Sequence, residues 1–175
     1  MKTPRPLAYI ALGSNLGDPA ATVQRAMERL EKLSARPLVR STLWRSLPVD
    51  CPPGSPDFVN AVVGLAPRRG ETPETLLAKL RSLEKEFGRA PKQVLNEPRP
   101  LDLDLLAWGE KQRHSATLIL PHPRAHQRKF VLQPLAEIAP DLVLPGQTET
   151  VFQLLASLGA GDVLLAVRRD RKSVV

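Results

Sequence analysis

The order of its periodic segments is the feature that most constrains the fold of this chain. Helical segments alternate with short apolar runs that have the length and composition of β-strands. The strand-like runs are LAYIAL, PLVRSTLWRS, FVNAVVGL and RPLDLDLL, and the helical segments between them are DPAATVQRAMERLEKL and TPETLLAKLRSLEKEFG. This β-α-β-β-α-β order predicts an α+β sandwich of ferredoxin-like type, with helices on one face of a mostly antiparallel sheet.

Both helical segments carry the residues that begin and end helices. Asp18 and Thr72 are expected N-caps, each followed by a proline at the first helical position, and Gly88 is expected to end the second helix. The expected apolar stripes are Val23, Met27, Leu30 and Leu33 in the first helix and Leu76, Leu80, Leu83 and Phe87 in the second. Further along, the middle of PHPRAHQRKFVLQPLAEIAPD is expected to be helical, and VFQLLASL and DVLLAVRR read as a last helix and strand.

Length and composition indicate one domain. The 175 residues are 42% hydrophobic, which is enough for a substantial core. We expect a core over about residues 8–144, a C-terminal helix and strand over 150–168, and a solvated basic tail over 169–175. A single cysteine, Cys51, excludes an intramolecular disulfide and fits a reducing compartment such as the cytoplasm. No apolar run is long enough to span a membrane, and we expect a monomer.

The net charge of +7 suggests an anionic partner, namely a nucleic acid, a membrane surface or a phosphorylated small molecule. One alternative function is that of a small basic domain that binds RNA. Such a domain needs exposed aromatic side chains interleaved with Lys and Arg on a sheet face. Only 4% of the residues are aromatic, and no such stripe is present in the sequence, so we expect no nucleic-acid partner.

The segment RPLDLDLL, Arg99 to Leu106, reads as a strand with two carboxylates on one face. Because side chains alternate along a strand, Asp102 and Asp104 leave one face while the leucines between and beside them leave the other. A solvent-facing strand surface is the ordinary interpretation of such a pattern. However, Asp is a poor strand residue, and it occurs here twice in three positions. Two carboxylates held close also repel each other, which favours a role in holding a cation.

The cation that best fits this pair is Mg²⁺ bound together with a polyphosphate. Mg²⁺ takes oxygen ligands and is usually held by one or two carboxylates plus substrate phosphates. Two such ions about 3.5–4 Å apart can share both side chains. No His or Cys spacing typical of zinc accompanies the pair. Cationic and imidazole groups follow it within a short stretch, namely His122, Arg124, His126, Arg128 and Lys129.

Three other features have structural as well as functional interpretations. The segment LGSNLGD lacks a phosphate-loop or dinucleotide pattern and reads by itself as a tight turn between a strand and a helix. His122, between two prolines, can be a packed loop residue. Glu84 follows the apolar stripe of the second helix, where a salt bridge is the ordinary role of a glutamate.

Four segments in order give the sequence a resemblance to a known enzyme family. They are AYIALGSNLGD, PDFVNAVV, RPLDLDLL and LPHPRAHQRKFVLQPLAEIAPD, which together span about residues 8–144. The sequence is similar to the 6-hydroxymethyl-7,8-dihydropterin pyrophosphokinases of folate biosynthesis. The resemblance implies a ferredoxin-like fold. It also implies transfer of a diphosphate from ATP to the pterin hydroxymethyl group, with AMP released.

The resemblance also implies roles for individual residues. Asp102 and Asp104 would bind two Mg²⁺ ions that bridge the ATP phosphates. Together with Arg89 and Arg99, they would be the catalytic residues. The ATP site would include Glu84, Arg89, Arg99, His122 and Arg128. The pterin site would include Asn60 at the polar edge of the ring, Phe58 and Phe130 on its two faces, and backbone groups near Ser46 and Val49. A flat heteroaromatic ring with amide-like edges suits two aromatic faces and one Asn.

Three positions depart from the family pattern. Glu97, Asn96 and Pro91 stand where members carry a small residue, a Trp and a second Arg. All three lie between Arg89 and Pro98, in a segment expected to close over the substrates, so they bear on closure and on ATP affinity. An inactive or altered homologue that binds nucleotide is the remaining alternative, and turnover with dihydropterin discriminates it.

Overall fold

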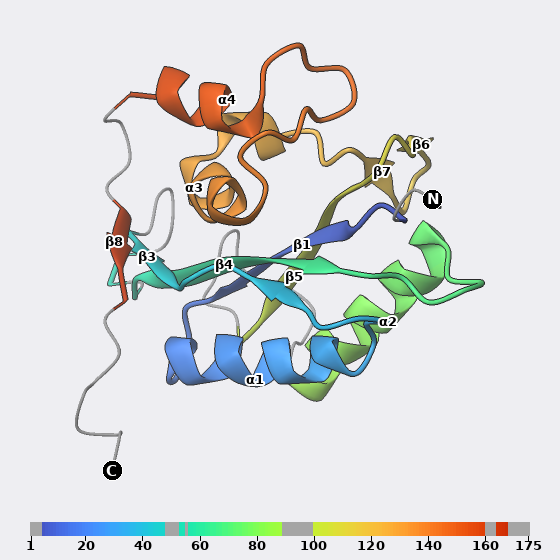
Figure 1. Ribbon diagram of the computed structural model, residues 1–175. Helices are drawn as coiled ribbons and strands as arrows, with labels where there is room; N and C mark the ends of the chain where they lie inside the picture. Colours follow the sequence, from blue (N-terminus) through green and yellow to red (C-terminus); the bar gives the residue numbers. More distant parts are fainter. Residues whose placement is uncertain (1–4, 48–52, 55, 89–99, 160–163, 168–175) are drawn as a thin grey trace.

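A computed structural model describes residues 5–47, 53–54, 56–88, 100–159 and 164–167 of the chain, and a single antiparallel sheet runs through its centre (Figure 1). The strands follow the order β5-β1-β4-β3-β8, and β2 pairs with β4 beside β3. Their bounds are β1 (Ala8–Ser14), β2 (Val39–Arg40), β3 (Trp44–Ser46), β4 (Phe58–Leu65), β5 (Asp102–Trp108) and β8 (Leu164–Ala166). The fourth expected strand therefore lies beside the first, and the third lies between the first and second. This order confirms the predicted α+β, ferredoxin-like arrangement.

Helices cover both faces of this sheet, which corrects the expectation of helices on one face. The helices α1 (Pro19–Glu31) and α2 (Pro73–Glu86) pack below it in Figure 1, and α3 (Lys129–Ile138) and α4 (Val151–Ser157) lie above it. A short 3₁₀ helix, η1 (Ala125–Gln127), precedes α3. β4 is buried on both of its faces, so each face of the sheet requires its own cover.

Each face of the sheet therefore has its own core. Ile10, Leu12 and Leu103 are buried against α1 and α2, whereas Val62 and Leu106 are buried against α3 and α4. Because side chains alternate along β5, the burial of Leu103 under α2 turns Asp102 and Asp104 toward the α3 side. The fold thereby places both carboxylates on the face that α3 shares with the sheet.

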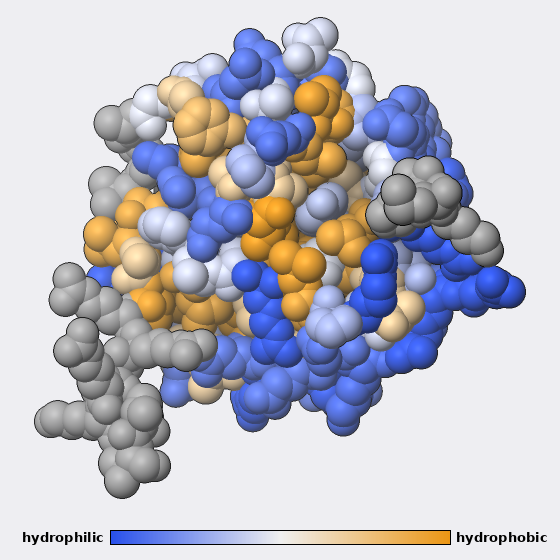
Figure 2. Space-filling view, viewed as in Figure 1, coloured by the Kyte–Doolittle hydropathy of each residue, from blue (hydrophilic) through white to orange (hydrophobic). Residues whose placement is uncertain are grey.

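The helix starts agree with the sequence. The Asp18 carboxylate accepts a hydrogen bond from the Ala21 N–H at 3.2 Å, and Thr72 forms a capping box with Thr75. The predicted apolar stripes of both helices contribute to the core below the sheet. Figure 2 shows hydrophilic residues along the lower margin of this view, where α1 and α2 turn their outer faces to solvent.

Two details differ from the sequence reading. The second expected strand is divided into β2 and β3, with Ser41 to Leu43 between them, although the Ser41 N–H still donates to the Val62 carbonyl of β4 at 3.0 Å. A small hairpin of β6 (Arg113–His114) and β7 (Ile119–Leu120), which periodicity did not predict, lies between β5 and η1 in the chain.

Within the described ranges, no helix has the length and apolar character needed to cross a membrane.

Candidate functional site

The two aspartates lie side by side on β5, as the alternation predicted. Both side chains are partly exposed, and the leucine between them is fully buried on the opposite face. Across the sheet, Asp102 pairs with Gly13 and Asp104 pairs with Ala11, so only small residues of β1 stand beside the carboxylates. Among the described residues, no group of three or more His, Cys, Asp or Glu side chains gathers to hold a metal ion. Two partly exposed carboxylates on one face fit Mg²⁺, which takes its remaining ligands from water and phosphate.

Two hydrogen bonds from α2 fix the middle of β5. Glu84 is buried on α2, and its Oε2 accepts a bond from the Leu103 N–H at 2.9 Å. The Nη1 of Arg81 donates to Glu84 Oε1 at 2.9 Å and to the Leu103 carbonyl at 2.8 Å. In the described sheet β5 is the terminal strand, so these side chains supply the donor and acceptor that another strand would offer. The salt bridge expected for Glu84 is confirmed, and its role in ATP binding stays a prediction.

Ser14 holds the entry to β5 from the other side. Its hydroxyl is fully buried and donates a hydrogen bond of 2.6 Å to the carbonyl of Pro100. The end of β1 is thereby tied to the segment that leads into Asp102. The LGSNLGD segment is thus more than a turn between β1 and α1, because one of its side chains positions the aspartate strand.

His122 enters the site from the segment after β7. Its backbone N–H donates to the Leu106 carbonyl of β5 at 2.8 Å, which brings the imidazole next to Asp104. Its Nδ1 accepts a bond of 3.2 Å from the Arg124 N–H. A ring nitrogen that accepts is unprotonated, so the proton of the neutral ring sits on Nε2. Nε2 is therefore the donor available to a ligand.

The electrostatics keep this imidazole neutral. Burial lowers the pKa of His122 below its usual value of 6.5, and Arg128 and Arg124 lower it further, while Asp104 acts in the opposite direction. Burial and the neighbouring Arg124 also lower the pKa of Arg128, which remains a cation because an arginine titrates far above neutral pH. A neutral donor and a fixed cation thus face Asp104 from the α3 side.

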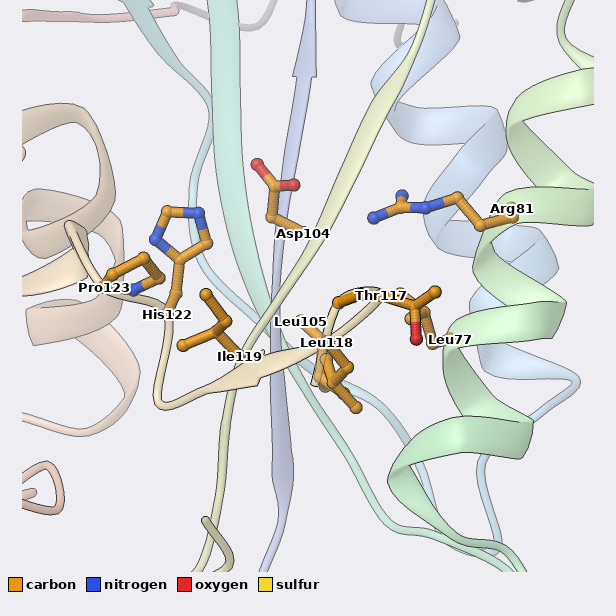
Figure 3. A pocket seen from close by; sticks show the side chains of 10 residues that line it. Leu77, Arg81, Asp104, Leu105, Thr117, Leu118, Ile119, His122 and Pro123 are labelled. Atoms are coloured by element: carbon orange, nitrogen blue, oxygen red, sulfur yellow. The ribbon is translucent and has the colours of Figure 1, made fainter. Parts of the chain in front are cut away.

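A pocket opens between α2, β5 and the β6–β7 hairpin (Figure 3). Its apolar walls are Leu77, Leu105, Leu118 and Ile119. Its polar lining includes Arg81, Asp104, Thr117 and His122. In Figure 3 the Asp104 carboxylate lies between the imidazole of His122 and the guanidinium of Arg81. A concave pocket that combines apolar walls with several polar side chains can hold a small molecule.

Sequence reasoning missed most of this pocket. Leu77, Arg81, Thr117 and Leu118 were not singled out from the sequence. The available signal was the position of Arg81 three residues before Glu84, because residues at that spacing share a helix face. The hairpin that supplies Thr117 and Leu118 is too short to be found by periodicity.

The predicted pterin residues that the structure describes lie on the same side of the sheet as the aspartates. Asn60 of β4 is buried and its Nδ2 donates to the Ser46 Oγ of β3 at 2.8 Å. Phe58 lies two residues before Asn60 on the same face. Phe130 begins α3 and is half-buried, and the guanidinium of Arg128 lies 5.5 Å from the centre of its ring. The structure therefore brings together residues that the sequence holds far apart.

Several sequence-based site predictions lie outside the described residues. They are Val49, Arg89 and Arg99, together with the departures at Pro91, Asn96 and Glu97. Their roles stay predictions.

Comparisons with known proteins show the family to which the chain belongs. The model of the family described as 7,8-dihydro-6-hydroxymethylpterin-pyrophosphokinase (HPPK) matches residues 9–140. Three bacterial proteins, each described as a 2-amino-4-hydroxy-6-hydroxymethyldihydropteridine pyrophosphokinase, are similar over most of the chain. The Synechocystis protein is 38% identical, covering 85% of this chain and 74% of its own. The Haemophilus influenzae protein is 41% identical, covering 83% and 91%. The Methylorubrum extorquens protein is 43% identical, covering 89% and 96%.

A solved structure shares the fold at low sequence identity. A chain described as HPPK-DHPS in complex with substrates superposes with a TM-score of 0.69 at 12% identity. The match covers 89% of this chain and 45% of that chain, so this chain spans less than half of it. The match of the family model over most of the chain, and relatives at about 40% identity, show the family. The chain is a member of the 7,8-dihydro-6-hydroxymethylpterin-pyrophosphokinase family and is therefore a pyrophosphokinase.

Proposed function

We propose that this chain transfers the β,γ-diphosphoryl group of ATP to the hydroxymethyl group of 6-hydroxymethyl-7,8-dihydropterin and releases AMP, as a step in folate biosynthesis. The observation that carries the proposal is the pairing of Asp102 and Asp104 on one face of β5, where Asp104 and the imidazole of His122 line the same pocket. Family membership supports the same reaction.

We assign the nucleoside of ATP to the pocket between α2 and the β6–β7 hairpin. The leucines of its walls suit a flat base, and Arg81 and Thr117 offer polar contacts to a sugar. A nucleoside held there directs its phosphates toward Asp104 and His122, which line the same pocket. The cations Arg89, Arg99 and Arg128 would contact the triphosphate, for which guanidinium groups have the right geometry.

Asp102 and Asp104 would hold two Mg²⁺ ions, whose charge neutralises the triphosphate and the negative charge that develops on AMP as it leaves. The neutral His122 would donate its Nε2 proton in a hydrogen bond to a phosphate oxygen. Such groups position the reactants and stabilise charge, which is most of what phosphoryl-type transfer requires from a protein.

The acceptor would lie beside Asn60, with Phe58 and Phe130 on its faces and Ser46 and Val49 nearby. Its hydroxyl oxygen forms a bond to the β-phosphorus, and the bond from that phosphorus to the bridging oxygen of the α-phosphate breaks. The electron pair of the broken bond stays with AMP, and the hydroxyl proton is released. No residue of the protein needs to become covalently attached.

Phosphorus NMR of the complete reaction tests the proposal. With ATP, Mg²⁺ and the pterin, we expect AMP and a pterin-linked diphosphate in equal amounts, without inorganic phosphate released in step. A reaction without the pterin is the control and should leave ATP intact. ADP as the stoichiometric product would instead indicate transfer of the γ-phosphoryl group, and the proposal would be wrong.

We also propose that the chain acts as a monomer in the cytoplasm. The single cysteine fits a reducing compartment. Light scattering during size-exclusion chromatography tests the oligomeric state. A mass near 19.3 kDa supports the monomer, and a mass of twice that value contradicts it.

A further inference from the structure

Gly13 of β1 lies between Asn60, assigned to the pterin, and Asp102, assigned to the metal. The ladder pairs Gly13 with Asn60 on β4 and with Asp102 on β5. Directly opposed residues in a sheet share a face, so Asn60, Gly13 and Asp102 form one row on the α3 side. Neighbouring strands lie about 4.8 Å apart, which puts Asn60 and Asp102 about 10 Å from each other across a position without a side chain.

The backbone at Gly13 does not require a glycine. Its φ lies outside the left-handed region, and its neighbours on both sides belong to a regular antiparallel ladder. A glycine inside a strand loses more conformational freedom on folding than a residue with a side chain and offers nothing to pack. Some property other than conformation must therefore favour glycine here, and the candidate is space.

A side chain at position 13 would crowd the Asn60 amide. A Cβ built on Gly13 would come within 3.3 Å of Asn60 Oδ1, and its next contact, the Val59 carbonyl oxygen, is 4.0 Å away. The amide has little freedom to move, because Asn60 is only 5% exposed and its Nδ2 is bonded to Ser46 Oγ at 2.8 Å. Relieving the crowding would require the amide to shift by about a few tenths of an ångström, against the hydrogen bond that holds it to Ser46.

We propose that Gly13 is a positioning residue for pterin recognition, which acts by keeping the Asn60 amide in its present orientation. With Nδ2 held by Ser46, Oδ1 stays above Gly13 as a fixed acceptor. A heterocycle with N–H donors at its edge can then bond to Asn60 and extend over Gly13 toward Asp102, where its hydroxymethyl group meets the phosphates. This inference rests on the proposed function, because it names the specificity determinant of the same site.

Gly13→Ala tests the proposal when it is compared with Asn60→Ala and with the double variant. We expect Gly13→Ala to weaken pterin binding about tenfold, as for the loss of one buried hydrogen bond, and to leave ATP binding within about twofold of the wild-type value. Titration calorimetry with each ligand alone measures both. In the Asn60→Ala background, Gly13→Ala should change pterin affinity by less than about twofold, because no amide remains to be displaced.

Thermal denaturation supplies a second readout that holds even where Gly13→Ala folds poorly. If the added methyl group crowds the Asn60 amide, it should lower the melting temperature in the wild-type background and not in the Asn60→Ala background. An equal loss in both backgrounds would contradict the proposal. So would wild-type pterin affinity in Gly13→Ala, or an undiminished tenfold loss in the double variant, which would mean that Gly13 acts on the ligand directly.

Gly64→Ala is the matched control. Gly64 also lies inside a strand and outside the left-handed region, and a Cβ there would crowd apolar groups, with Leu7 Cδ1 at 3.0 Å and Tyr9 Cε1 at 3.4 Å. We expect it to affect stability and to leave both ligand affinities within about twofold. A pterin-selective loss in Gly64→Ala would show that general strain produces the same effect and would overturn the proposal.

The wild-type protein separates this inference from the proposed function. Should the wild type fail to bind the pterin or to release AMP, the proposed function fails. Should the wild type pass both tests and Gly13→Ala show no pterin-selective loss, only the role of Gly13 is wrong.

Discussion

Glu84 and Leu103 are joined across the outer edge of the sheet by a hydrogen bond of 2.9 Å, and Leu103 is the residue between the two aspartates. Arg81 links the same two residues, because its Nη1 donates hydrogen bonds both to Glu84 and to the Leu103 carbonyl. The strand that carries the two carboxylates is thus held by side chains of α2, and one of them, Arg81, also lines the pocket between α2 and the β6–β7 hairpin.

Arg81→Met should loosen this strand. The variant loses two hydrogen bonds of Arg81, but its side chain is 46% exposed, so we expect a loss of only about 1 kcal/mol in the free energy of unfolding. The Mg²⁺ concentration for half-maximal turnover should rise, because the carboxylates are held less well. Urea denaturation and a magnesium titration of the rate measure the two effects.

Arg29→Met is the control for Arg81→Met. Arg29 pairs with Glu86 on the surface of α1 and α2, with both side chains nearly half exposed. Its removal should cost less than about 0.5 kcal/mol and leave the magnesium dependence unchanged. An unchanged magnesium dependence in Arg81→Met as well would mean that α2 does not control the aspartates.

Asp102→Ala and Asp104→Ala should each abolish turnover without unfolding the protein. Both carboxylates are partly exposed, so neither supports the core, and the loss of one relieves repulsion between like charges. Turnover should fall by about a thousandfold or more, which corresponds to roughly 4 kcal/mol of the barrier. Rates at saturating Mg²⁺, together with melting curves, provide the measurement. Near-normal turnover in either variant would refute the metal assignment.

The two phenylalanines of the pterin site should differ in their effect on ATP. Phe58→Ala should weaken only pterin binding, by an amount that reflects about 0.5–1.5 kcal/mol of lost stacking. Phe130→Ala should weaken pterin binding similarly and also ATP binding by a few fold, since the Arg128 guanidinium lies over the Phe130 ring. Calorimetry with each ligand alone distinguishes them. An equal effect of Phe58→Ala on both ligands would mean that the two sites are misassigned.

His122 should titrate below the usual imidazole pKa of 6.5 in the ligand-free protein, because burial and two nearby arginines disfavour its cation. The unfolded chain then binds this proton more readily than the folded one. Protonation of His122 in the unfolded chain therefore lowers the free energy of unfolding as the pH falls below about 6.5, and has no such effect above that pH. Proton NMR should follow the titration, and His122→Gln should flatten the pH dependence of stability between about pH 5 and 6.5. An imidazole that titrates above 6.5 would contradict the prediction.

The helices and the pairing of the aspartates follow from local properties of the sequence. Asp18 and Thr72 cap their helices because a short polar side chain can reach the free amides of the first turn, whatever the rest of the chain does. Asp102 and Asp104 share a face because any strand alternates. Local geometry sufficed in both cases, and the structure agrees with the sequence.

The remainder of the site depends on contacts between distant segments. Glu84 reaches Leu103, Asn60 lies opposite Gly13, and His122 is tied to Leu106, over separations that no local pattern encodes. The prediction that the helices lie on one face of the sheet was also wrong. The pattern of β4 is apolar throughout, so it is compatible with helices on either face or on both. The sequence by itself determined which residue types carry the chemistry and which of them share a strand. Only the tertiary structure decided which of them meet, because strand register and helix packing are set by the burial of the whole core rather than by any single segment.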